Sequence, residues 1–208
     1  MAERELPLFP LNVVLFPSMR LPLHIFEERY KLMIGTCMVT DQTFGVALIE
    51  SGEEVGGPAQ IFKVGTTARI VEIDRLPDGQ MNLVVIGVDR FKLLEQFADK
   101  PYATGRVELL PEIPEAAPAG LSARVAHKFR RYLISAGVPE QQAAGLALPD
   151  DPQELSYVVA AVLKAPARRR QRLLEDTSIV SRLTTELALL EWATGGPTDL
   201  NGRSFSIN

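Results

Sequence analysis

The sequence contains one cysteine and two histidines among its 208 residues. A single cysteine cannot form an intramolecular disulfide, and it cannot build a zinc site from several thiolates. A catalytic thiol also needs a base, and the only histidines that could serve are His24 and His127. We therefore interpret Cys37, which falls on a predicted helix, as a small buried hydrophobe.

Long hydrophobic runs are missing as well. No apolar segment approaches the roughly 20 residues that cross a bilayer. The opening MAERELPLF carries acids where a signal peptide has a basic region. Hydrophobic residues make up 46% of the chain and charged residues 23%, as in an ordinary globular protein. These features predict a cytoplasmic protein with no membrane partner.

Motifs that bind nucleotides or activate nucleophiles are absent. The chain has no G-x-x-x-x-G-K-[ST] phosphate loop and no G-x-S-x-G turn. The glycine-rich loop 51–58 lacks the lysine and the following helix that a phosphate site needs. His24 with Glu27 and Glu28 comes nearest to a metal site, but both acids suit the first turn of a helix. We predict no catalytic residue, cofactor or metal.

What the sequence does have is an opening stretch, Leu6–Met33, that combines four prolines with many large apolar residues. Proline fixes φ and removes a backbone donor, so this stretch predicts short extended segments separated by turns. We expect them at 6–8, 13–16 and 20–26. The apolar period then changes to three and four residues, which predicts an amphipathic helix from about Glu27.

The rest of the chain divides by pattern. Extended apolar segments and a proline–glycine turn at 76–80 predict a β-rich domain, a small half-open barrel, over residues 1–113. Residues 120–194 have helical periodicity and predict an all-α domain. Residues 195–208 are typical of a disordered tail. The predicted fold class is therefore α+β.

The distribution of charge supports this division. Residues 1–115 hold 11 basic and 17 acidic side chains, a net charge of −6, and residues 116–208 hold 11 and 9, a net charge of +2. The basic clusters, around Arg124–Arg131 and Arg168–Arg172, lie in the helical half, and Phe129 is the single aromatic residue interleaved with them, fewer than the stacking platform of a nucleic-acid site needs. We interpret them as solvated helix faces rather than as a nucleic-acid surface.

The opening LPLFPLNVVLFPSMRLPLHIFEERYKLMI and the later block GVDRF at 87–91 resemble the amino-terminal substrate-binding domain of the Lon protease family. The chain resembles most closely the stand-alone bacterial proteins that keep this domain, and the similarity covers nearly its whole length. One departure is Ser18, where the family pattern would have glycine. The resemblance implies a PUA-like pseudo-barrel followed by helices. It also implies a non-catalytic module that binds unfolded or partly folded polypeptides for proteolysis or quality control, with a protease as a further partner.

Two other classes of function stay open at this point. PUA-like domains elsewhere bind RNA, so an RNA-binding protein is the alternative hypothesis. An enzyme with an unseen site is the third, but no residue pattern supports it, because the ATPase and serine-lysine protease of Lon have no counterpart motifs here. We interpret Asp89 and Arg90 as a structural pair beside a strand bend.

The candidate polypeptide-binding residues lie in the opening stretch. On a strand, successive side chains alternate between faces, so Leu21, Leu23 and Ile25 share one face. Phe16 and Met19 flank a proline turn, where burial is hardest. If this set stays exposed, it would form an apolar patch suited to unfolded chains, with Met19 as an adaptable contact.

Overall fold

The computed structural model describes residues 3–55 and 59–195. Contacts between residues divide the chain into two compact units. The barrel unit comprises residues 1–113 together with 164–175, and the helical unit comprises 114–163 and 176–208. Each unit has its own hydrophobic core, and each is described by itself.

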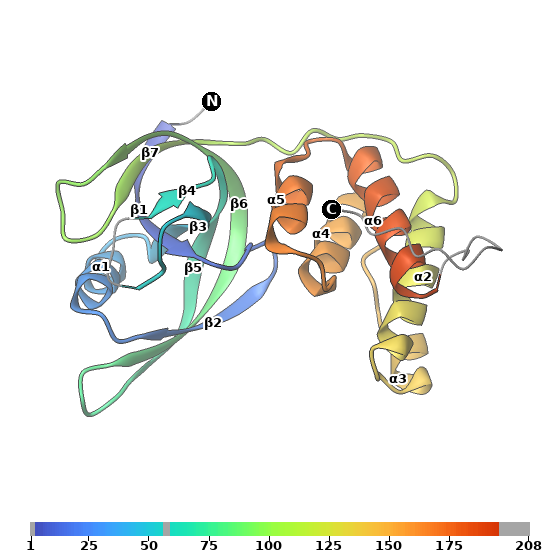
Figure 1. Ribbon diagram of the computed structural model, residues 1–208, viewed down its shortest axis with the longest axis horizontal. Helices are drawn as coiled ribbons and strands as arrows, with labels where there is room; N and C mark the ends of the chain where they lie inside the picture. Colours follow the sequence, from blue (N-terminus) through green and yellow to red (C-terminus); the bar gives the residue numbers. More distant parts are fainter. Residues whose placement is uncertain (1–2, 56–58, 196–208) are drawn as a thin grey trace. The chain divides into compact units, whose positions relative to one another are not determined.

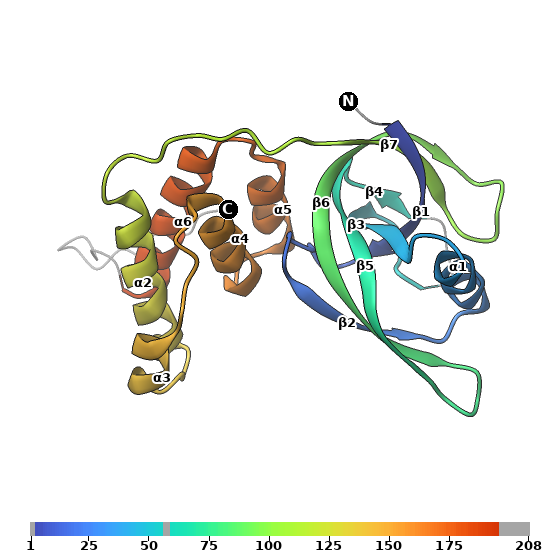
Figure 2. The same ribbon diagram turned by 180° about the vertical axis from the view of Figure 1, so that it is seen from behind.

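The described residues of the barrel unit contain a seven-stranded sheet (Figure 1). Its strands are β1 (Glu3–Leu11), β2 (Arg20–Ile25), β3 (Thr43–Ser51), β4 (Gln60–Ile61), β5 (Val64–Arg75), β6 (Met81–Phe97) and β7 (Thr104–Leu109). The order is β1-β7-β6-β5-β3-β4, and a parallel pairing of β1 with β3 closes the sheet into a ring. Figure 2 shows the same curved sheet from behind.

The 17-residue strand β6 organises the barrel because it pairs with three strands. Its first half pairs with β2, its second half with β7, and β5 runs along its other edge. Buried side chains from β1, β2, β3, β5 and β6 and from α1 (Glu28–Met38) form one hydrophobic cluster of the barrel unit, and side chains from β1, β3, β4, β6 and β7 form a second. β2 has no partner other than β6 among the described strands, so its second edge is unpaired.

The helix α5 (Ala167–Glu175) packs with the barrel unit although it follows the other helices in the chain. The side-chain amide of Gln171 donates to the carbonyl of Val64 at 2.9 Å. The buried Arg90 donates from Nη1 to the carbonyl of Leu174 at 3.0 Å, and from Nε to Glu112 at 2.9 Å. The Arg90 guanidinium therefore links the end of α5 to β6.

The helical unit contains four helices in its described part: α2 (Leu121–Ser135), α3 (Glu140–Gly145), α4 (Pro152–Val162) and α6 (Ile179–Ala193). The apolar faces of α2, α4 and α6 share one core. The Asp151 side chain caps α4 by accepting from the backbone N–H of Glu154 at 2.9 Å, with Pro152 at the first helical position.

The α+β class, with a β-rich part before the helices, is confirmed. Two local predictions are wrong. Residues 14–16 are buried and residue 13 is partly buried, but they form no strand. We expected α5 in the helical domain, whereas its polar contacts place it with the barrel. The independence of domains 1–113 and 120–194 stays a prediction, and residues 196–208 of the expected tail lie outside the described residues.

Candidate functional site

The five predicted binding residues do not form one exposed patch. Phe16 is 0% exposed and Ile25 is 1% exposed, while Met19, Leu21 and Leu23 are partly buried and pack against the barrel core. The guanidinium of Arg170, on α5, lies 5.5 Å from the centre of the Phe16 ring.

The pairing of β2 explains this burial. Leu21, Leu23 and Ile25 do share one face, as alternation requires. Their partners on β6 are Val85, Leu83 and Met81, which are themselves buried. The shared face therefore packs on the hydrophobic cluster that includes α1. Ile25 on this face and Phe16 before the strand are both buried, so they are wrong as surface contacts.

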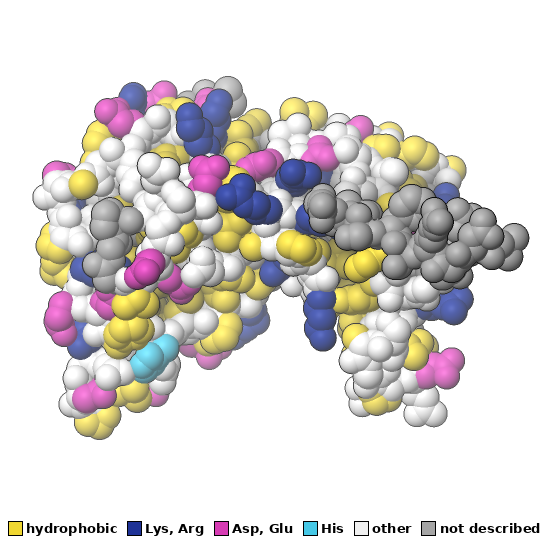
Figure 3. All heavy atoms as spheres, viewed as in Figure 1, with side chains coloured by type: hydrophobic (Ala, Val, Ile, Leu, Met, Phe, Trp, Pro, Cys, Tyr) yellow, Lys and Arg dark blue, Asp and Glu magenta, His cyan; other side chains and the backbone are white. Residues whose placement is uncertain are grey.

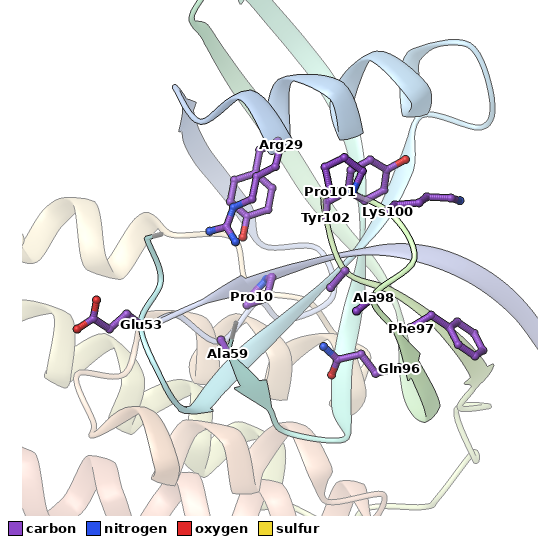
Figure 4. A pocket seen from close by; sticks show the side chains of 12 residues that line it. Pro10, Arg29, Glu53, Ala59, Gln96, Phe97, Ala98, Lys100, Pro101 and Tyr102 are labelled. Atoms are coloured by element: carbon purple, nitrogen blue, oxygen red, sulfur yellow. The ribbon is translucent and has the colours of Figure 1, made fainter. Parts of the chain in front are cut away.

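Three adjoining hollows on the barrel unit offer a different surface. The first, which we call the tyrosine hollow, has a volume of about 410 Å³. Residues from β1, from α1 and from the β6–β7 connection line it, among them Pro10, Arg29, Tyr30, Phe97, Pro101 and Tyr102. Figure 4 shows Arg29 and Tyr102 on the α1 side of this hollow, with Gln96 and Ala59 across from them.

The second, which we call the seam hollow, lies between β1 and β2 and has a volume of about 220 Å³. No pairing links these two strands in the described part of the chain. The residues that line it include Phe9, Leu11, Leu23, Phe26, Val55 and the shared Tyr30. Phe26 is 48% exposed and Val55 is 53% exposed, so the rim of this hollow carries large apolar side chains in contact with water.

The third, which we call the ladder hollow, lies on β2, β6 and β5 and has a volume of about 490 Å³. It shares Pro22, Leu23 and His24 with the seam hollow. The seam hollow therefore lies between the other two: it shares Tyr30 with the tyrosine hollow and residues of β2 with the ladder hollow. In Figure 3 a histidine side chain of the barrel unit lies among hydrophobic and acidic side chains.

Polar contacts fix the residues around the seam hollow. The Asn12 backbone N–H donates to Glu54 Oε2 at 2.9 Å, and Arg29 donates to the Glu54 carbonyl at 3.4 Å. These bonds hold the loop that presents Val55. Arg29 also pairs with Glu27 at 3.0 Å, and its guanidinium lies 4.5 Å from the centre of the Tyr30 ring. Burial raises the pKa of Tyr30, although the charge of Arg29 opposes this shift.

The histidine, cysteine and charged side chains that the sequence offered as candidates for chemistry make contacts typical of structural residues. His24 Nδ1 lies 2.8 Å from Asn82 Oδ1. Within the described residues, no three His, Cys, Asp or Glu side chains come together as a metal ion would require. Burial raises the pKa of Cys37 to about 11, so the thiol stays protonated. Asp89 and Arg90 lie where the register of β6 against β5 shifts, beside a strand irregularity as expected. Arg90 pairs with Glu112, and the Asp89 N–H donates to Thr67 Oγ1 at 2.9 Å, so both have structural contacts.

The model of the ATP-dependent protease La (LON) substrate-binding domain matches residues 5–191. The chain belongs to the LON substrate-binding domain family. Similar proteins include a Lon protease of Anaeromyxobacter dehalogenans and Lon protease 2 of Myxococcus xanthus, each 31% identical over 89% of this chain. The matched part is 23% of each of those proteins, so the chain spans about a quarter of their length.

Solved structures agree with this membership. A Lon N-terminal domain protein from Xanthomonas campestris is 27% identical, with a TM-score of 0.69, and the match covers 89% of this chain and 98% of that one. The N-terminal domain of a Mycobacterium avium complex Lon protease has a TM-score of 0.64 over 90% of this chain and 98% of that one. At 17% identity, the second match shows the fold alone.

Sequence reasoning missed Phe26 as a site residue and Val55 altogether. Phe26 ends the apolar run of β2 one residue after the strand, where alternation no longer dictates burial. Val55 stands in the acidic, glycine-rich loop, which carries no packing signal in the sequence. A lone valine among acids and glycines was the available clue.

Proposed function

We propose that this LON substrate-binding domain is a non-catalytic module that binds unfolded or partly folded polypeptides along the three hollows of its barrel unit. The observation that carries the proposal is the run of adjoining, largely apolar hollows on a member of a substrate-binding family. An extended chain presents side chains at regular intervals, and several shallow contacts give the broad recognition that varied substrates need.

The context of proteolysis is part of the same proposal. The similar proteins are named Lon proteases, and this chain corresponds to about a quarter of each. We infer that bound polypeptides pass from this module to a protease. We also keep the cytoplasm as the expected location. Across residues 3–55 and 59–195, no helix is both long and apolar enough to span a membrane.

The RNA-binding alternative has less support. Acidic side chains and no Lys or Arg line the seam and ladder hollows, a charge pattern that repels phosphate. In the basic cluster at 168–172, the guanidinium of Arg168 lies 5.6 Å from the Phe62 ring and Arg170 lies over Phe16. These two side chains have packing roles, so the cluster is not simply a solvated face. The comparisons give the alternative no support.

Fluorescence anisotropy with a labelled, reduced and alkylated lactalbumin tests the function. We expect saturable binding of this unfolded protein, no binding of the native form, and a loss of affinity of about fivefold or less between 0.05 and 0.5 M salt, far smaller than the loss expected for phosphate binding. A single-stranded RNA of similar length should not compete. Failure to bind the unfolded protein, or equal binding of the native form, would overturn the proposal.

Two double variants, one at the hollows and one away from them, test where the polypeptide binds. Changing both Phe26 and Val55 to Ser should weaken binding about tenfold, since two apolar rim contacts are lost. Changing both Leu32 and Val39 to Ser is the control, because these side chains are 52% and 83% exposed and line none of the three hollows. Equal effects of the two pairs would argue against the hollows as the site.

A further inference from the structure

The seam hollow has the size of a side-chain pocket. Its volume of about 220 Å³ is below the roughly 300–1,000 Å³ typical of small-molecule sites. Its walls include Phe9 and Leu11 of β1 and Leu23 of β2, with Phe26 and Val55 exposed at the rim. Such a pocket suits one bulky aliphatic or aromatic group rather than a whole ligand.

The edge of β2 limits what else a bound chain can contact. The backbone N–H of Gly87 donates to the Met19 carbonyl at 3.0 Å, so alternation directs the backbone groups of residues 21, 23 and 25 toward β6. The free edge then consists of Arg20, Pro22 and His24. Pro22 has no N–H, which interrupts continuous strand addition at the centre of this edge. Selection of a bound segment therefore depends on side chains.

The charged side chains that line the seam and ladder hollows are all acidic. Glu27 and Glu54 line the first, Glu72 and Asp74 line the second, and no Lys or Arg lines either. Arg29 pairs with Glu27, and Arg20 pairs with Glu72. Asp74 is exposed and has no ion pair within the described residues, and the Glu54 carboxylate accepts there from the neutral Asn12 N–H, while Arg29 donates only to the Glu54 backbone carbonyl. These last two carboxylates keep a negative charge to offer a partner.

We propose that the seam hollow takes one bulky apolar side chain of an extended polypeptide. In this proposal, which rests on the polypeptide-binding function, a Lys or Arg one or two residues away lies against the acidic rim. In an extended chain, alternate side chains are about 6.6–7 Å apart along the strand, so one residue can fill the hollow while its neighbours reach the rim. The preferred partner is therefore an unfolded segment in which apolar and basic residues are interspersed.

Three nine-residue peptides test this preference by competing with labelled, unfolded lactalbumin. The first has a central Leu flanked on each side by two Lys in a Gly/Ser background, the second has Glu in place of Lys, and the third has Ser in place of Leu. We expect the first to compete at least fivefold better than either of the others in 0.1 M salt. The advantage over the Glu peptide should shrink in 0.5 M salt, because the rim charges are exposed.

Variants of the rim complete the test. Glu54→Gln combined with Asp74→Asn should abolish the preference for Lys over Glu. Glu50→Gln combined with Glu108→Gln, which removes the same charge away from the hollows, should leave it intact. Equal competition by the Lys and Glu peptides, no competition by any of them, or a preference unchanged by the rim variant would overturn this inference while binding of the unfolded protein persists. Loss of that binding itself would instead remove the proposed function.

Discussion

Ser18 holds a demanding position in the turn between Phe16 and Met19. Its φ is 64°, in the left-handed region that favours glycine. The Met19 N–H donates to the Phe16 carbonyl at 3.1 Å, and the Ser18 N–H donates to the Gly87 carbonyl at 2.8 Å. The turn thus lies directly on β6, and a Cβ on Gly87 would meet the Phe16 carbonyl oxygen at 2.2 Å.

Two substitutions at this turn should change the free energy of unfolding in opposite directions. Ser18→Gly should raise the free energy of unfolding by about 1 kcal/mol, because it relieves the left-handed strain. Gly87→Ala should lower it by about 1–3 kcal/mol, because backbone atoms must move apart. Urea denaturation measures both, and Gly35→Ala is the control, since nothing lies within 4 Å of its added Cβ. A Gly87→Ala variant as stable as the control would contradict this view of the turn.

Glu186 is a buried acid in the helical unit. Its Oε1 accepts from the Ser156 hydroxyl at 2.8 Å, and Ser156 Oγ accepts from Arg182 Nε at 3.0 Å. Burial raises the pKa of Glu186 from its ordinary value of 4.5 to about 8, although the Ser156 hydrogen bond and the charge of Arg182 act against this shift. The folded protein therefore binds a proton here that the unfolded chain releases.

Stability should consequently fall with rising pH. The contribution of protonated Glu186 is complete below about pH 4.5 and is lost as the pH rises through about 8, with a slope of at most about 1.4 kcal/mol per pH unit. Thermal unfolding of the wild type and of Glu186→Gln between pH 5 and 8.5 measures this, because glutamine cannot ionise. Parallel pH profiles for the two proteins would show that Glu186 does not titrate in this range.

At the scale of elements, most strands and helices follow from local patterns in the sequence. The turn at 76–80 joins β5 to β6, and Asp151 caps α4 as expected. α6 begins one or two residues later than expected, because Ser178 rather than Asp176 or Thr177 accepts from the Ser181 N–H. Turns and helix caps of this kind can be predicted from the sequence because both partners lie within a few residues of each other.

Burial of β2 and the placement of α5 could not be predicted in the same way. Which face of β2 turns inward depends on its register with β6, some 60 residues later. The hydrogen-bond partners of Arg90 are the Glu112 carboxylate and the Leu174 carbonyl, which lie 22 and 84 residues away in the sequence. No periodicity encodes such distant contacts, so the sequence alone predicts a binding role for Phe16 and Ile25 and a place for residues 167–175 in the helical domain.

Arg90 should be a main anchor of α5. Arg90→Met removes its bonds to Glu112 and to the Leu174 carbonyl. It should cost about 2–3 kcal/mol, because hydrogen bonds of charged groups are lost and a carbonyl is left without this donor. Arg20→Met is the control, since the pair of Arg20 with Glu72 is exposed and such pairs contribute about 0–1 kcal/mol. Similar unfolding free energies for the two variants would show that Arg90 does not anchor the helix.

At the scale of the whole molecule, residues 164–175 return to the barrel unit after the chain has formed α2, α3 and α4. We expect limited proteolysis to cut first within 112–120, which has no helix or strand before Leu121, or within loop 51–58. After a single cut at 112–120, the two fragments should elute together in native size-exclusion chromatography, because α5 stays bound to β5 and β6 through Gln171 and Arg90. Elution as two separate fragments would contradict this arrangement.

Hydrogen–deuterium exchange tests the central claim, polypeptide binding along the hollows of the barrel unit. The 208-residue chain is compared with and without saturating unfolded lactalbumin. We predict slower exchange in peptides that span residues 20–27 and 50–55, which contain residues that line the seam and ladder hollows, among them Glu54 and Val55, and unchanged exchange in α6. Slower exchange confined to the helical unit, or none on the barrel unit under saturation, would contradict the account.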